Sequence, residues 1–224
     1  MMSLYLTTLP SDYINMHIPS KFKETNLDTL YQLITDYPLA TLITSDAGQL
    51  DACHTPFHLN KSDSGEVVLQ SHIAKANDLW QTASNGQDVL LVFNGPNSYI
   101  SPNFYPSKKE TGKVVPTWNY SVVHVKGQIS FKHEKKWLLQ LLETLSDFHE
   151  NKSQERPWSV SDAPQEFTDK LLDAVVGIEI KINDIVGNFK LSQNKSSEDY
   201  AGVIGGLDNS GNVLEALVAK QMKR

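Results

Sequence analysis

The chain has 224 residues, a single cysteine and a formal net charge of −6. This length suits one large or two small domains with a sizeable core, and Cys53 alone excludes an intrachain disulfide and a cysteine-based zinc site. The acidic total argues against a broadly basic surface for nucleic acid. The first residues lack a signal-peptide pattern and no run reaches the length of a membrane span, so we expect a soluble, cytoplasmic protein.

Regular hydrophobic patterns divide the first half of the chain. Apolar residues at helical spacing predict an amphipathic helix over residues 26–37. A short helix is also predicted over Lys75–Ala83. Four strands are predicted from alternating or β-branched residues, at Leu39–Thr44, Leu50–Leu59, Glu66–Ile73 and Asp88–Asn94. Turn-forming residues separate the first three strands, which indicates a meander.

A long connection rich in proline and aromatic residues follows, from Asn94 to Tyr120. Loops of this length inside a domain are usually functional or disordered, and disordered segments are poor in large aromatics. We interpret it as an ordered wall around a flat or anionic ligand. The alternative is a structural flap that closes one end of a barrel.

The second half alternates strands with helices. One strand is predicted over Trp118–Phe131, with a bend at Gly127, and another at Ile178–Ile185, extended by Asn188–Ser192. Helices are predicted over Glu134–Glu150, from Pro164, from Ser197 and over Asn212–Lys223, the last two separated by a turn at Gly205–Asp208. This order predicts an α+β fold with an antiparallel barrel and peripheral helices. We expect one domain over residues 1–224 with a helical C-terminal extension from about residue 195.

The turn after the third strand is the strongest candidate for anion binding. A helix beginning near Lys75 would present free N–H groups and a positive dipole end. His72, Lys75 and Asn77 could add donors to a phosphate monoester. The alternative is an Asn N-cap beside an exposed lysine.

Other chemistries have weaker support. His54 and His58 would stand about 13 Å apart on a strand, too far to share a metal, so we expect none. Cys53 and His54 would point to opposite faces, and Gly-rich nucleotide loops are missing from the sequence. The second helix of the tail begins with apolar and acidic residues, so we interpret it as a packing or dimer-contact helix rather than a DNA-reading one.

Seven segments in the same order resemble one protein family. They are HIPSKFKE at 17, YPLATLIT at 37, SHIAKANDLW at 71, GPNSYISPNFYPSKKETGKVVPTWNY at 95, RPWSVSDAP at 156, VGIEI at 176 and KLSQNKS at 190. They resemble the PaiB family of FMN-binding negative transcriptional regulators, split-barrel flavoproteins related to pyridoxamine-phosphate oxidases. The resemblance implies an antiparallel split β-barrel that forms a homodimer with FMN at the subunit interface.

The resemblance also implies which residues bind the cofactor. Transferred by motif, the cofactor-binding residues are His72, Lys75, Asn77, Thr117, Trp118, Asn119, Lys190 and Gln193, the last two in a segment that completes the site from the partner subunit in related split barrels. Relatives carry Arg where this chain has Lys75, which keeps a point charge but loses a bidentate fork. Phe104-Tyr105 replaces a Trp-Tyr pair and so loses an indole donor.

Three functions are compatible with the sequence. The first is a flavin-binding homodimer that represses transcription. The second is an FMN-dependent oxidoreductase, an oxidase or reductase of a small substrate, in which His54 could donate a proton. The third is a barrel that binds another planar ligand such as haem, or has lost its cofactor. Ligand contact is expected at Pro116–Tyr120, with Ser101–Gly112 serving the dimer or an entrance lid.

Overall fold

The computed structural model describes residues 16–46, 48–61, 64–153 and 155–223. Its strands form one antiparallel sheet in the order β3-β2-β6-β7-β8-β5-β4, with β1 on the edge of β8. The strands are β1 (Lys23–Glu24), β2 (Leu39–Asp46), β3 (Gln49–Pro56), β4 (His58–Lys61), β5 (Val67–Ala74), β6 (Asp88–Ile100), β7 (Thr117–Lys132) and β8 (Val175–Lys190). The α+β antiparallel architecture predicted from the sequence is therefore confirmed.

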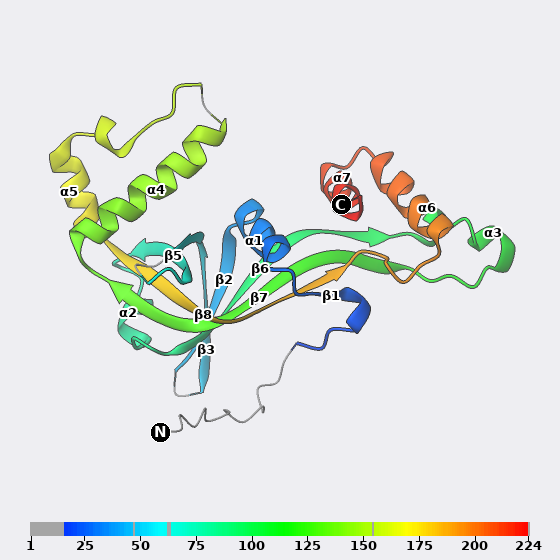
Figure 1. Ribbon diagram of the computed structural model, residues 1–224, viewed down its shortest axis with the longest axis horizontal. Coiled ribbons are helices and arrows are strands. Elements are labelled where there is room, and N and C mark those ends of the chain that lie inside the picture. Colours follow the sequence, from blue (N-terminus) through cyan, green and yellow to red (C-terminus); the bar gives the residue numbers. More distant parts are fainter. Residues whose placement is uncertain (1–15, 47, 62–63, 154, 224) are drawn as a thin grey trace, which may run out of the picture.

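Helices gather over the two ends of this sheet. Figure 1 shows α4 and α5 above one end and α6 and α7 above the other. The helices are α1 (Leu27–Asp36), α2 (Leu79–Thr82), α3 (Lys108–Thr111), α4 (Lys135–Ser153), α5 (Gln165–Asp173), α6 (Ser197–Asp208) and α7 (Val213–Met222), with 3-10 turns η1 (Ser20–Phe22), η2 (Pro102–Phe104) and η3 (Val160–Asp162). In the described part of the chain, none of these helices is both long and apolar enough to cross a bilayer.

The sheet curls on itself but leaves a split. β3 and β4 stand at the two ends of the strand order, yet Phe57 alone separates them in the sequence. Side chains bridge the gap between β3 and β5: the hydroxyls of Thr55 and Ser71 are 2.8 Å apart, and Ser71 donates to the carbonyl of Pro56 at 2.7 Å. Hydrogen bonds from side-chain hydroxyls therefore link β3 to β5, in place of the backbone hydrogen bonds that would close the barrel.

The core inside the curl is closed by α1. Asn26 caps this helix by accepting from the N–H of Thr29 at 3.0 Å, and Leu30, Leu33 and Ile34 face inward. They join the inward side chains of β2, β5, β6, β7 and β8, among them Leu42, Leu69, Leu91, Phe93, Val125, Ile129 and Ile180, in one cluster. These residues alternate along their strands, as a sheet buried on one face requires.

The predicted connection from Asn94 to Tyr120 is shorter than expected, mainly because β6 runs six residues beyond its predicted end, while β7 starts one residue before its predicted start. β6 continues to Ile100 and β7 starts at Thr117, so residues 101–116 alone connect them. A bulge between Asn94 and Asn97 lets the ladder resume after Pro96, which has no N–H to donate. A second register shift falls between Lys126 and Gly127, where the sequence predicted a bend.

The C-terminal helices cover the far ends of β6 and β8. Ile100, Tyr105 and Leu191 pack with residues of α6 and α7 in a second cluster. The turn predicted at Gly205–Asp208 is wrong, since α6 continues to Asp208. The reason is packing: a Cβ on Gly202 would lie 2.2 Å from the carbonyl oxygen of Phe104, and one on Gly206 would lie 2.3 Å from its ring. These glycines bring α6 close to η2 rather than ending the helix.

This contact predicts opposite effects for two substitutions in one helix. Gly202→Ala should destabilise the protein by about 1–3 kcal/mol, because the new methyl group meets backbone that cannot yield. Gly205→Ala, which meets nothing within 4 Å, should be neutral or stabilise by up to about 1 kcal/mol through helix propensity. Urea unfolding of both variants measures the difference, and equal stabilities would contradict the close contact.

Candidate functional site

The predicted anion turn lies at the end of β5. His72 is still within the strand, and its Nδ1 atom is buried without a hydrogen-bond partner in the described structure. The ammonium of Lys75 is near the surface, 3.4 Å from the carbonyl of Asp173. Asn77 uses its side chain internally, accepting from the N–H of Leu79 at 3.0 Å and lying 3.6 Å from the sulfur of Cys53.

The helix expected to support this turn is too short for that role. α2 covers Leu79–Thr82 only, so the prediction of a helix over Lys75–Ala83 is wrong. The N–H of Lys75 donates to Ala174 and its carbonyl accepts from the indole of Trp80, which holds the chain in turns before α2. Because a dipole needs several aligned peptides, Lys75 and His72 are the candidates that remain for binding an anion at this turn.

A second group of predicted residues meets at the opposite end of the sheet. The ammonium of Lys190, the last residue of β8, donates to the hydroxyl of Thr117 at 2.6 Å. Trp118 is 53% exposed, and its ring stands edge-on to that of Tyr99 with 6.2 Å between centroids. This arrangement places a cation beside an exposed aromatic surface, which suits a flat anionic ligand.

A cavity of about 500 Å³ adjoins these aromatic side chains. It is lined from β6 and β7 around the bulge, by residues that include Val92, Asn97, Trp118, Tyr120 and His124. The bulge brings the two backbones close, since a Cβ on Gly95 would lie 2.2 Å from the hydroxyl oxygen of Ser121. The volume lies in the range of small-molecule sites.

Two residues expected at the cofactor have structural roles in this chain. Asn119 is fully buried, accepting from Ser192 at 3.0 Å and facing the sulfur of Met222 at 3.5 Å. Gln193 accepts from the N–H of Leu191 at 2.7 Å and donates to the carbonyl of Phe189. Both hold the bend after β8, where Ser192 has a φ of 65°, the one positive value outside glycine among the described residues.

The two groups lie far apart within one chain. His72 pairs with Gly177, which pairs with Lys132, the last residue of β7. Thr117 is the first residue of that 16-residue strand, so about 50 Å of strand separates the groups at about 3.3 Å per residue. Figure 1 shows these opposite ends of β7 under different helices. A single copy therefore does not bring all the predicted cofactor residues together.

Several contacts near the site were not anticipated from the sequence. Asn188 donates to the hydroxyl of Tyr120 at 3.2 Å, while its own Oδ1 is buried and lacks a donor among the described residues. No motif marks this pair, because the two residues belong to strands that are distant in sequence. His54, considered as a proton donor, lies exposed on β3 opposite Thr41.

The segment Ser101–Gly112 is tied to α6. Asp199, 7% exposed, accepts from the N–H of Ser107 at 3.1 Å and from its hydroxyl at 2.8 Å. Ring contacts between α6 and Phe104 add to this anchor. The segment thus forms the base on which α6 rests in this copy.

Solved structures of similar fold define the class of protein. The flavocytochrome Anf3 from Azotobacter vinelandii matches with a TM-score of 0.54 at 16% identity, over 80% of this chain and 75% of that one. An FAD and heme binding protein from Mycobacterium smegmatis matches with a TM-score of 0.55 at 14% identity, over 80% and 79%. At these identities the likeness concerns the fold, and the fold is the flavin-binding split barrel.

Sequence comparison then identifies the family. Residues 16–184 match the family described as "Putative FMN-binding domain". The chain is 33% identical to the protease synthase and sporulation protein PAI 2 of Bacillus subtilis over 93% of its length and 97% of that protein. An uncharacterised Aspergillus fumigatus protein is 32% identical over 93% and 97%. The chain belongs to this FMN-binding family, so the predicted PaiB resemblance and the FMN cofactor are confirmed.

The described residues fit such a cofactor. Lys75 and Lys190 provide two cations, and Trp118 and Tyr99 an exposed aromatic surface, for a phosphate and a flat ring system respectively. The partnerless Nδ1 of His72 and Oδ1 of Asn188 can each take a further hydrogen bond.

Burial at His72 predicts an acid-sensitive fold. Desolvation lowers the pKa of His72 below its ordinary value, so the folded state favours the neutral ring. As the pH falls through about 6.5, the unfolded chain takes up the proton first, and stability present above that pH is lost. Replacing His72 with Gln should reduce the slope of unfolding free energy against pH by up to about 1.4 kcal/mol per unit. Denaturant unfolding between pH 5 and 7.5 tests this, and an unchanged slope would contradict it.

Proposed function

We propose that this protein is a PaiB-like negative transcriptional regulator that works as a homodimer, with each FMN held between two copies. The separation of the two groups of cofactor residues by the length of β7 carries the proposal. A two-fold axis that places the Lys190 end of one copy beside the Lys75 end of the other would complete two equivalent sites. Each copy would then contribute one part to each site.

The outer face of β6 and β7 supports this arrangement. Tyr99 and Trp118 are 47% and 53% exposed beside the 500 Å³ cavity, although most large aromatics of a folded domain are covered. A second copy packed there would cover these rings and enclose the flavin between subunits. Aromatic residues are enriched at such interfaces.

Within that site the chain's own residues would have distinct tasks. Lys75 would bind the phosphate as a point charge, and Lys190, oriented by Thr117, would approach the cofactor from the other copy. Bound FMN supplies a redox-active ring whose state a regulator can sense. The free thiol of Cys53 fits a reducing compartment such as the cytoplasm.

Removing one lysine tests the phosphate assignment. Lys75→Ala should weaken FMN binding by about 1.5–3 kcal/mol, the range for a hydrogen bond to a charged group. Lys136→Met, which removes an exposed charge from α4, serves as the control. Flavin fluorescence titration of the apoprotein measures both affinities. Equal affinities for Lys75→Ala and the unmodified chain would reject this phosphate site.

Mixed dimers test whether the site is shared. Lys75→Ala and Lys190→Met should each lose FMN affinity as homodimers. In a mixed dimer, Lys75 of one copy meets Lys190 of the other at one interface, so one full-affinity site per dimer should return. A site built within one copy would gain nothing from mixing. Differently tagged subunits, purified as the mixed dimer, allow the FMN stoichiometry to be measured.

The regulatory role makes a separate prediction. The FMN-loaded protein should shift a subset of genomic DNA fragments, with affinity that falls as salt rises because phosphate contacts release counterions. Flavin reduction should change that affinity if FMN is the sensed group. Absence of any salt-sensitive, sequence-preferring shift would reject the regulator. Turnover of nicotinamide with a defined acceptor would instead support an FMN-dependent oxidoreductase.

A further inference from the structure

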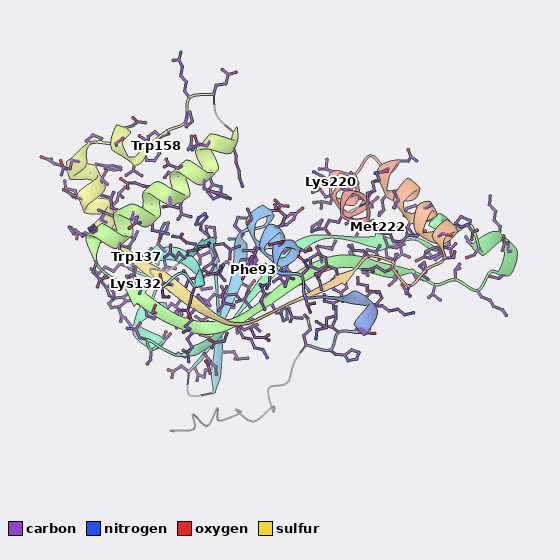
Figure 2. All side chains as sticks on the ribbon, viewed as in Figure 1. Phe93, Lys132, Trp137, Trp158, Lys220 and Met222 are labelled. Atoms are coloured by element: carbon purple, nitrogen blue, oxygen red, sulfur yellow. The ribbon has the colours of Figure 1, made fainter. Side chains whose placement is uncertain are left out.

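A second cavity, of about 460 Å³, lies between α4 and the sheet. Its lining comes from β4 and β5, from β7 and β8, and from α4, and includes Lys61, Gln70, Lys132, Trp137, Leu141 and Glu179. Figure 2 labels Lys132 and Trp137 close together at the end of the sheet over which α4 begins. None of the predicted cofactor residues lines this cavity, so it is separate from the flavin residues already described.

A row of hydrogen-bonded polar side chains crosses four neighbouring strands on its sheet side. The side-chain amide of Asn60 donates to the side-chain oxygen Oε1 of Gln70 at 2.9 Å. The side-chain nitrogen Nε2 of Gln70 donates in turn to the carboxylate of Glu179 at 2.9 Å. The other oxygen of Glu179 lies 3.0 Å from the ammonium of Lys132. Gln70 is only 7% exposed, and partners at both ends fix its amide. The row is therefore rigid and held by the sheet itself.

The α4 side of the cavity combines the apolar side chains of Trp137 and Leu141 with the polar Gln140 and Thr144. Trp137 rests on β8, since a Cβ on Gly177 would lie 2.2 Å from the Cζ3 atom of its indole. The opposite, N–H-bearing edge of the indole is therefore turned away from Gly177. Leu141, one turn further along α4, is buried beside it. Together they offer a surface for the face of an aromatic ring.

Positive charge remains in excess. Lys61 and Lys132 stand against the single carboxylate of Glu179, which leaves one net positive charge in the lining. Lys132 has three N–H groups and one described partner, and no described residue pairs with the side chain of Lys61. A polar cavity beneath a covering helix carries unused donors that water or a ligand must satisfy. An anion is the ligand that this charge balance favours.

We propose that this cavity binds a small aromatic carboxylate. The carboxylate accepts from Lys132 and Lys61, while the ring lies against Trp137 and Leu141. The volume lies in the range of small-molecule sites. Glu179 holds Lys132 in place and repels ligands that carry more than one negative charge on that side.

The test uses 2-naphthoate and its neutral analogue 2-naphthamide with the full-length, FMN-loaded protein. Calorimetric titration should show saturable binding of naphthoate, about ten-fold or more tighter than naphthamide, as the charge-assisted contact requires. The double variant Lys132→Met with Glu179→Gln keeps the shape of the pair without its charges. Because Lys61 remains, this variant should reduce that preference several-fold without abolishing it, and it should keep its FMN content.

Two further variants make the result decisive. Lys136→Met removes a neighbouring exposed charge from α4 outside the cavity, and should bind naphthoate as the unmodified protein does. Thr144→Trp fills the cavity from α4 and should weaken naphthoate binding about ten-fold or more. This variant provides the test of the site if circular dichroism shows that the double variant does not fold. Three results would each overturn the proposal: no saturable binding, equal affinity for the two probes, or loss of FMN from the double variant.

Discussion

The continuous antiparallel pairing of β7 with both neighbours is the constraint on which the rest of the molecule depends. Within this 16-residue strand, residues 117–128 pair with β6 on one edge and residues 120–132 pair with β8 on the other, past a bulge near Asn94 and a register shift at Gly127. A strand of that length extends beyond a single core, and the sheet carries one hydrophobic cluster beneath α1 and a second one beneath α6 and α7. Phe189 packs against both hydrophobic clusters and links them.

This length also determines how a cofactor can be held. The cation at Lys75 and the cation at Lys190 lie at opposite ends of the same ladder. Within a copy they cannot converge on one ligand, because a paired strand does not fold back on itself. In the two-fold assembly that we propose, that separation becomes a shared site, in which the exposed rings of Tyr99 and Trp118 would be covered by the second copy.

The two faces of the sheet differ in what they bury. The inner face carries Leu, Ile, Val and Phe beneath α1. The outer face beneath α4 carries the row from Asn60 to Lys132, whose members are joined by hydrogen bonds and an ion pair, while Lys132 keeps further N–H groups to donate. An apolar face would have packed against α4 at a lower cost in free energy, since each buried polar group must find a hydrogen-bond partner. This end of the barrel therefore differs from the apolar inner face in that it keeps a polar row beside a cavity.

Much of the fold could be predicted from local patterns. Alternating residues indicated the strands, and helical spacing with Asn26 as a cap indicated α1, because these signals depend on neighbours in the sequence. Family motifs identified the FMN class and its candidate residues. By contrast, Pro96 and the aromatic residues suggested a loop where β6 continues past Asn94, because a bulge depends on the partner strand. Gly205 and Gly206 suggested a turn, although Gly206 serves contact with Phe104.

Local sequence patterns indicate most of the strands and helices, exclude an intrachain disulfide and supply the motifs of an FMN-binding chain. Where those motifs lie depends on tertiary contacts: Asn119 lies in a buried hydrogen bond, Lys190 donates to Thr117, and Lys75 follows β5 near the Lys132 end of β7. The physical reason is that strand order, register and bulges arise from pairing between segments far apart in the chain, and these long-range contacts leave no local pattern.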